Sequence, residues 1–219
     1  FGSALVAVPL LVRFLPLPFV VPFMMALDFA ASFMLGGSQR QHIVWGELKW
    51  LLPASMAGAL LGIYLLLRLP QNWLLLALGA LVVLFGLRSI LALHGEAPIA
   101  RAWAIPAGLI GGSLSAMFGT GGPPYVIYLS HRLRDKTLLR ATFSGLFVID
   151  GGFRLLVFLA SVLLLQPHLW LAWLFALPVA ALGLLLGHKL HLGLSNAQML
   201  RLVGVLLVFS GGALVWKAL

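Results

Sequence analysis

The sequence predicts an all-α polytopic membrane protein, and two observations support this prediction. Of the 219 residues, 62% are hydrophobic and 9% are charged, whereas soluble domains carry about 45–50% apolar and about 25% charged residues. Apolar runs also recur at a length of about 20 residues, which a helix needs to cross a hydrocarbon core of about 30 Å. Leucine-rich runs of this length are helical, so we expect lipid to surround most of the chain.

Six apolar runs are long enough to span a bilayer. They cover residues 17–37, 48–67, 72–93, 140–165, 169–187 and 197–217. Two further segments are not clean spans, because residues 1–12 start inside an apolar run and residues 102–130 are interrupted by the sequence GTGGPP. The chain starts without methionine, so we expect an N-terminal piece, including a first half-helix, to be absent from this sequence.

An internal repeat divides the predicted membrane domain into residues 1–95 and residues 96–219. Six polar or helix-bending residues of the first half recur in the same order, most of them 125 positions later. The pairs are Asp28 and Asp150, Pro53 and Pro178, Gly58 and Gly183, Gly62 and Gly187, Asn72 and Asn196, and Gly79 and Gly204. The opening FGSALVAVPLL then corresponds to TGGPPYVIYLS. Agreement of these residue types in order is difficult to obtain by chance among leucine-rich helices.

Positive charge indicates how the two halves are related. If the interrupted segment enters and leaves on one face, the loops of that face hold ten Lys and Arg residues and the opposite loops hold three. If the segment crosses the membrane, the division is eight against five. Because Lys and Arg gather on the cytoplasmic side, the first arrangement fits better. Each half then has a re-entrant element plus three spans, so we expect inverted repeats, an architecture of secondary transporters.

The interruption GTGGPP contains groups suited to an anion. Gly119, Gly121 and Gly122 accept positive φ and leave backbone N–H groups uncovered, while the two prolines that follow stop a helix from continuing. A broken helix directs the positive end of its second half at the break. Thr120 adds a hydroxyl, and Ser3 is its expected neighbour from the first half. The alternative is a kink that only lets helices pack closely.

Arg154 lies midway along a predicted span, where an arginine costs about 2.5–3.5 kcal/mol on insertion scales. Asp150 precedes it by four residues, so the two side chains are spaced for an ion pair on one helix face. One interpretation makes this pair purely structural. In the other, Arg154 is the fixed cation for a substrate oxyanion and Asp150 holds it in place, because a guanidinium fork matches sulfite and sulfonate oxygens.

Other polar residues have less specific interpretations. Asp28 has no basic residue within a helical turn, which makes it a candidate proton carrier, the alternative being a protonated carboxyl bonded to a neighbouring helix. Tyr128 is a candidate hydroxyl donor to the substrate, although packing is the more common role for such a tyrosine. The six histidines show no ligand spacing and there is no cysteine, so we expect no metal and no cofactor.

The stretch GTGGPPYVIYLSHRLRDKTLLRATFSGLFVIDGGFRLLVFLA, residues 119–160, resembles the C-terminal signature of the sulfite exporter TauE/SafE family. The opening FGSALVAVPLL resembles the end of that family's N-terminal glycine motif, which adds Gly2 to the candidate substrate contacts. The resemblance covers essentially the whole chain. It implies a bacterial inner-membrane transporter that moves sulfite, sulfonates and related anions.

We therefore expect a transporter, and an exporter in particular, because one anionic charge that leaves a negative interior gains about 2.3 kcal/mol per 100 mV. The alternatives are an anion channel and an intramembrane enzyme that acts on a lipid phosphate, although the acids and histidines are too scattered to favour catalysis. The expected partners are a small anion, the bilayer and, through Asp28, protons. Homo-oligomers are left open. The basic residues lie in short loops, which argues against nucleic acid.

Overall fold

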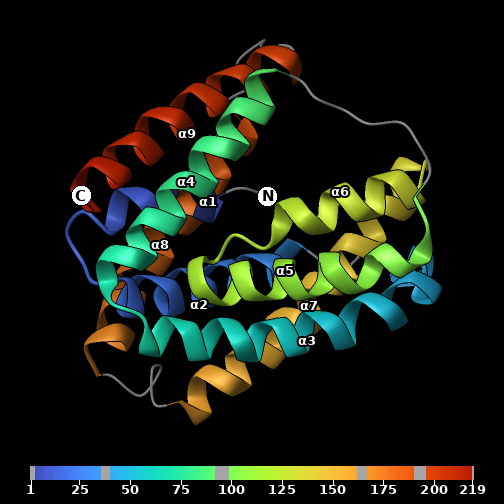
Figure 1. Ribbon diagram of the computed structural model, residues 1–219, viewed down its shortest axis with the longest axis horizontal. Coiled ribbons are helices and arrows are strands. Elements are labelled where there is room, and N and C mark those ends of the chain that lie inside the picture. Colours follow the sequence, from blue (N-terminus) through green and yellow to red (C-terminus); the bar gives the residue numbers. More distant parts are fainter. Residues whose placement is uncertain (1–2, 36–39, 92–98, 162–166, 190–195, 219) are drawn as a thin grey trace.

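A computed structural model describes residues 3–35, 40–91, 99–161, 167–189 and 196–218 of the protein (Figure 1). These residues form α-helices and two short 3-10 helices, and no strand occurs among them. The α-helices are α1 Ser3–Leu11, α2 Leu17–Leu35, α3 Trp45–Arg68, α4 Gln71–Ile90, α5 Ala104–Phe118, α6 Gly122–Arg132, α7 Lys136–Ala160, α8 Pro167–Lys189 and α9 Asn196–Ala218. The 3-10 helices are η2 Arg40–His42 and η3 Arg101–Trp103.

The all-α prediction is confirmed, and each of the six predicted spans corresponds to one long helix. Among the described residues, α3, α4 and α7 are long and apolar enough to cross a membrane by length and composition. Shorter apolar stretches lie within α2, α8 and α9. The 24 residues of α3 give a length of about 36 Å at a rise of 1.5 Å per residue, enough for the hydrocarbon core with some tilt.

Local sequence explains where several helices begin and end. The residue before a proline avoids the helical region, and α3 ends at Arg68, just before Leu69 and Pro70. Asp135 caps α7 by accepting hydrogen bonds from the backbone N–H groups of Thr137 at 2.7 Å and Leu138 at 3.0 Å. These N–H groups, that of Leu138 first, hold the pKa of the Asp135 carboxyl below its usual range.

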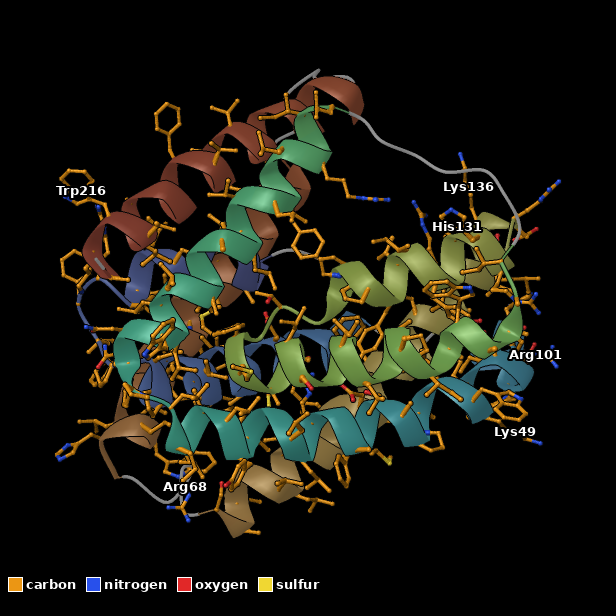
Figure 2. The ribbon with its side chains drawn as sticks, in the orientation of Figure 1. Lys49, Arg68, Arg101, His131, Lys136 and Trp216 are labelled. Carbon is orange, nitrogen blue, oxygen red and sulfur yellow. The ribbon has the colours of Figure 1, made fainter. Side chains whose placement is uncertain are left out.

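Helices α5 and α6 form a hairpin whose two outer ends lie together. Arg101 precedes α5 and Arg132 ends α6, and both pair with Glu47 on the first turn of α3, at 3.2 Å and 2.8 Å. Arg132 also donates to the carbonyl oxygen of Ile99 at 3.2 Å. Figure 2 shows Arg101 and His131 at the same end of the molecule, with Arg68 at the opposite end. The interrupted segment therefore returns to the end from which it started.

Glycines let α5 lie directly against α3, and the two helices run parallel (Figure 1). A Cβ on Gly58 would overlap the carbonyl oxygen of Leu109, and one on Gly112 would overlap that of Ser55. Gly62 meets Ser113 in the same way. Such contacts are the small-residue packing of membrane helices, in which close approach replaces a hydrophobic driving force. The packing holds α5 rigidly on α3.

Helices α4 and α9 pack antiparallel through a symmetric set of contacts. A Cβ on Gly79 would lie 2.9 Å from the carbonyl oxygen of Gly211, and one on Gly211 would lie 2.8 Å from that of Gly79. Gly86 and Gly204 approach each other in the same way, at 2.8 Å and 2.9 Å. Gly204 and Gly211 lie 125 positions after Gly79 and Gly86. If each glycine is replaced by its equivalent in the other half, the same two contacts result, so the contact is symmetric.

Helix α1 reaches the hairpin at the turn between α5 and α6. A Cβ on Gly119 would lie 3.4 Å from the Cβ of Ala4 and 3.9 Å from a methyl group of Val8. Ala4 and Val8 are buried, as is Phe118 at the end of α5. The described part of the first interrupted segment thus contacts the glycine turn of the second.

Cysteine labelling tests the hairpin, because the chain has no native cysteine. We expect Ala100→Cys and Arg134→Cys, which flank the hairpin at exposed positions, to react with a membrane-impermeant maleimide from one side. Asn72→Cys at the start of α4 should react from the other side, since α3 crosses between them. The unmodified chain is the control. Reaction of Ala100→Cys and Arg134→Cys from opposite sides would show that α5 and α6 cross the membrane.

Candidate functional site

An ion pair lies inside the helical bundle, in the middle of α7. Asp150 and Arg154 are 0% and 4% exposed, and Nε of Arg154 lies 3.0 Å from Oδ2 of Asp150. The arginine also donates from Nη1 to the carbonyl oxygen of Ser115, at 3.1 Å, in the last turn of α5. The predicted pair is therefore present, and its guanidinium lies against the interrupted segment.

Two further hydroxyls extend this pair into a buried polar chain. Ser55 on α3 donates to Oδ1 of Asp150, and the hydroxyl of Tyr125 on α6 lies 2.6 Å from that of Ser55. The chain connects α3, α5, α6 and α7 at one point. Neither Nε of Arg154 nor Oδ2 of Asp150 makes a geometrically satisfactory hydrogen bond within the described residues, so their contact is an ion pair that leaves some hydrogen-bonding capacity unused.

The turn between α5 and α6 contains one residue in the left-handed conformation. Among the described glycines, only Gly119 has a positive φ, of 69°, and it ends α5 in the left-handed conformation that glycine adopts most easily. Gly121 has φ of −71° and precedes α6 as its N-cap, and Gly122 is the first residue of α6. Of the three glycines that accept positive φ, only Gly119 adopts it, since one left-handed residue is enough to end α5.

Space explains the other two glycines. A Cβ on Gly121 would overlap the carbonyl oxygen of Gly111 and the side chain of Ser115. A Cβ on Gly122 would meet nothing within 4 Å among the described residues. Gly121 is thus required by close packing, whereas Gly122 faces open space at the start of α6.

Unpartnered hydrogen-bond donors gather at this turn. The hydroxyls of Ser115 and Thr120 are buried, at 1% and 3% exposure, and neither has a hydrogen-bond partner among the described residues. Ser115 Oγ lies 2.8 Å from the position of a Cβ on Gly121. The N–H groups of Gly121 and Gly122 likewise have no partner in the described part of the chain. Because native structures seldom leave such groups unpaired, these donors suit an anionic ligand.

Tyr128, a predicted substrate contact, lies elsewhere. Its hydroxyl donates to Oε2 of Glu47, inside the cluster that Arg101 and Arg132 complete at the outer ends of the hairpin. Tyr125, one turn earlier, is the tyrosine that reaches the ion pair. Tyr128 as a substrate contact stays a prediction, and in this structure its hydroxyl is bonded to a carboxylate outside the buried polar chain.

The remaining predicted residues divide into two groups. Asp28 on α2 is partly buried and has an interaction partner, so it is not the isolated carboxylate that the sequence suggested. Gly2 and the side chain of Ser3 lie outside the residues that the structure describes. No group of three metal-ligating side chains occurs among the described residues.

Ser55, Ser115 and the role of Tyr125 were not predicted from the sequence. Ser115 lies one helical turn before Gly119, so its hydroxyl could have been placed near the glycine turn from spacing alone. Ser55 offered a weaker signal, as a hydroxyl two residues after the repeated Pro53. Its partner Asp150 is 95 residues away, and nothing local indicates that contact.

The chain is similar to known proteins over most of its length. The model of the sulfite exporter TauE/SafE family matches residues 1–214. The chain belongs to this family. A relative from Comamonas testosteroni, the "Probable inner membrane transporter protein TsaS", is 33% identical over 198 residues, which cover 87% of this chain and 82% of the relative. No solved structure matches the chain.

Membership in the TauE/SafE family settles the class of activity. Its members are transporters, so this chain is a multi-pass inner-membrane transporter and not an enzyme that acts on lipid phosphates. A transporter needs a site that binds and releases, without a nucleophile or an acid–base pair.

The two glycines that start α6 should respond differently to substitution. We expect Gly121→Ala to destabilise the protein by about 1–3 kcal/mol, the usual cost of overpacking, because its Cβ would overlap backbone. We expect Gly122→Ala to keep the wild-type melting temperature in detergent and to transport more slowly, since its Cβ would stand beside the free N–H groups. Equal loss of stability in both variants would contradict the difference in space.

Proposed function

We propose that the protein exports small sulfur-containing or organic oxyanions, of the sulfite and sulfonate class, and binds them at the turn between α5 and α6. The observation that supports this most directly is the set of hydrogen-bond donors that have no partners among the described residues. The hydroxyls of Ser115 and Thr120 and the N–H groups of Gly121 and Gly122 all lie beside or within the turn. Arg154 supplies the formal positive charge next to them.

The charge balance favours weak, reversible binding. Asp150 already pairs with Arg154, so the site is close to neutral before the anion arrives. Neutral donors then contribute much of the affinity, at about 1.5–3 kcal/mol for each hydrogen bond to a charged group. A conducting or carrier site must hold its ion strongly enough to admit it and weakly enough to release it. A fully unpaired buried arginine would bind an oxyanion too tightly for rapid release.

Export is the direction that needs no coupling ion. A negative interior drives one anionic charge outward by about 2.3 kcal/mol per 100 mV. Coupling to protons is a separate question, and Asp28 on α2 is the residue to examine for it, because it lies within an apolar helix. Dependence of flux on an imposed pH gradient would identify such coupling.

We also propose that residues 1–95 and 96–219 are inverted repeats. The exchange symmetry of the α4 and α9 contact supports this, since a two-fold axis in the membrane plane relates antiparallel helices in that way. The return of the α5–α6 hairpin to Glu47 supports it as well, because a re-entrant element leaves each half with an odd number of crossings. The contact of Ala4 and Val8 with Gly119 brings the two interrupted segments together.

Flux into proteoliposomes tests the proposed substrate. We expect wild-type protein to accelerate the movement of sulfite, thiosulfate and sulfoacetate, with saturation at high concentration, and to leave inorganic cations unaffected. Saturation distinguishes a carrier from an open channel. Failure to move any anion of the panel, in protein that keeps its melting transition, would refute the proposed class of substrate.

Ser115→Ala tests the turn in the same assay. The hydroxyl has no partner among the described residues, so its removal should not lower the melting temperature, but the KM for the anion should rise about tenfold or more. Ser113→Ala is the matched control on the same helix, because the Ser113 hydroxyl already donates to the carbonyl oxygen of Gly58 at 2.9 Å. Its KM should not change. A KM that rises equally in both variants would remove Ser115 from the site.

Substitutions in the ion pair separate its two interpretations. Arg154→Gln leaves Asp150 as a buried lone charge and should cost about 3–5 kcal/mol of stability. Adding Asp150→Asn should restore stability, since the amide oxygen still accepts from Ser55. We expect the double variant to stay inactive because the cation is lost, and Arg154→Lys to keep weakened transport, because an ammonium lacks the guanidinium fork. Recovery of flux in the double variant would make the pair purely structural.

A further inference from the structure

A groove of about 480 Å³ lies on the outer surface between α3 and α5, away from the buried polar chain. Its lining is almost entirely apolar, with one cationic side chain. The residues are Lys49, Trp50, Pro53, Ala54, Ala57, Ile105 and Leu109. The α3 members recur at helical spacing and thus form one face, while Ile105 and Leu109 lie one turn apart on α5.

Small side chains open this groove where the helices are closest. A Cβ on Gly108 would lie 2.6 Å from the Cβ of Ala54, so the two backbones nearly touch beneath the groove. Ala54 and Ala57 have only a methyl side chain and so do not fill the groove. Trp50, Ile105 and Leu109 line it and are 52%, 48% and 39% exposed. An apolar groove with this lining suits part of an acyl chain.

The cationic end of the groove lies at the level of a membrane interface. Lys49 is exposed, and it forms no hydrogen bond or ion pair with any described residue. Trp45, Trp50 and Trp103 are 52%, 52% and 59% exposed at the same end, as tryptophans are where a membrane meets water. Figure 2 shows Lys49 beside Arg101 at this end of the molecule.

Pro53 adds a second polar feature at the cationic end. A proline inside a helix removes the hydrogen bond to the carbonyl four residues earlier, and Pro53 lies inside α3. The carbonyl oxygen of Lys49 therefore loses its usual helical donor. The end of the groove thus offers an ammonium for a phosphate and a carbonyl for a hydroxyl.

We propose that this groove is a binding site for an anionic phospholipid whose headgroup carries hydroxyls, such as phosphatidylglycerol. One acyl chain lies along Pro53, Ala57 and Leu109, and the phosphate pairs with Lys49. Basic residues at the ends of membrane helices bind anionic headgroups in this way. The site is separate from the proposed anion site, which is built from buried groups on the inner side of α5.

Native mass spectrometry of the full chain, released from micelles that contain phosphatidylglycerol and phosphatidylcholine with identical acyl chains, tests the proposal. We expect the wild-type protein to retain phosphatidylglycerol preferentially. Lys49→Gln should lower this preference about fivefold, which corresponds to the attraction of one surface lysine. Lys136→Gln is the matched control, because Lys136 is exposed at the start of α7 and does not line the groove.

A second pair of variants tests the acyl channel. Ala57→Phe fills the groove from an exposed position and should abolish retention of both lipids, whereas Ala80→Phe on the exposed face of α4 should leave retention unchanged. Equal retention of the two lipids by the wild type, or equal effects of Lys49→Gln and Lys136→Gln, would overturn the proposal. A wild-type mass of two chains without lipid, lost in Ala57→Phe, would also overturn it and assign the groove to a second copy.

Discussion

The structure depends on the break between α5 and α6, because a helix that ends inside a membrane protein leaves backbone groups that must find partners within the protein. The turn after α5 solves part of this problem locally. The N–H of Gly119 bonds to the carbonyl of Ser115 at 2.9 Å, and the N–H of Thr120 bonds to that of Leu114 at 3.4 Å. Arg154 adds a charged donor to the same Ser115 carbonyl, at the end of α5 where the helix dipole favours a cation. A buried arginine and a broken helix thus stabilise each other.

Several acceptors near this break have donors. The carbonyls of Leu114 and Ser115 receive hydrogen bonds, and Asp150 is held by both Arg154 and Ser55. The hydroxyls of Ser115 and Thr120 remain without partners in the described part of the chain. Unpaired hydroxyl donors in a buried position lower the cost of bringing an anion there. In the proposed site, the turn that ends α5 thus lies beside groups that favour an anion.

Sequence reasoning succeeded where the signal is local. Apolar runs predicted the helices, and i,i+4 spacing predicted the pair of Asp150 and Arg154. It failed where the partner is distant, because Ser55 meets Asp150 through the packing of α3 against α7. Tyr125 and Tyr128 are three residues apart on one helix face, yet one bonds to Ser55 and the other to Glu47. Only the position of the neighbouring helices distinguishes them.

The proposed repeat separates residues that build the scaffold from residues that bind. The packing glycines of α4 recur 125 positions later in α9. In an antiparallel contact across a two-fold axis, a glycine of one helix lies against a glycine of the other, so both helices must have them. Asp150 has its equivalent in Asp28, but Ser55 and Arg154 of the site do not recur. Alanine stands 125 positions after both Ser55 and Glu47, and Ser32 stands where alignment of Asp28 with Asp150 would place an equivalent of Arg154. The symmetric contact between α4 and α9 needs the same residues in both halves, whereas one bound anion needs only one cation. The two halves can thus share a scaffold while the charge for binding comes from the second half.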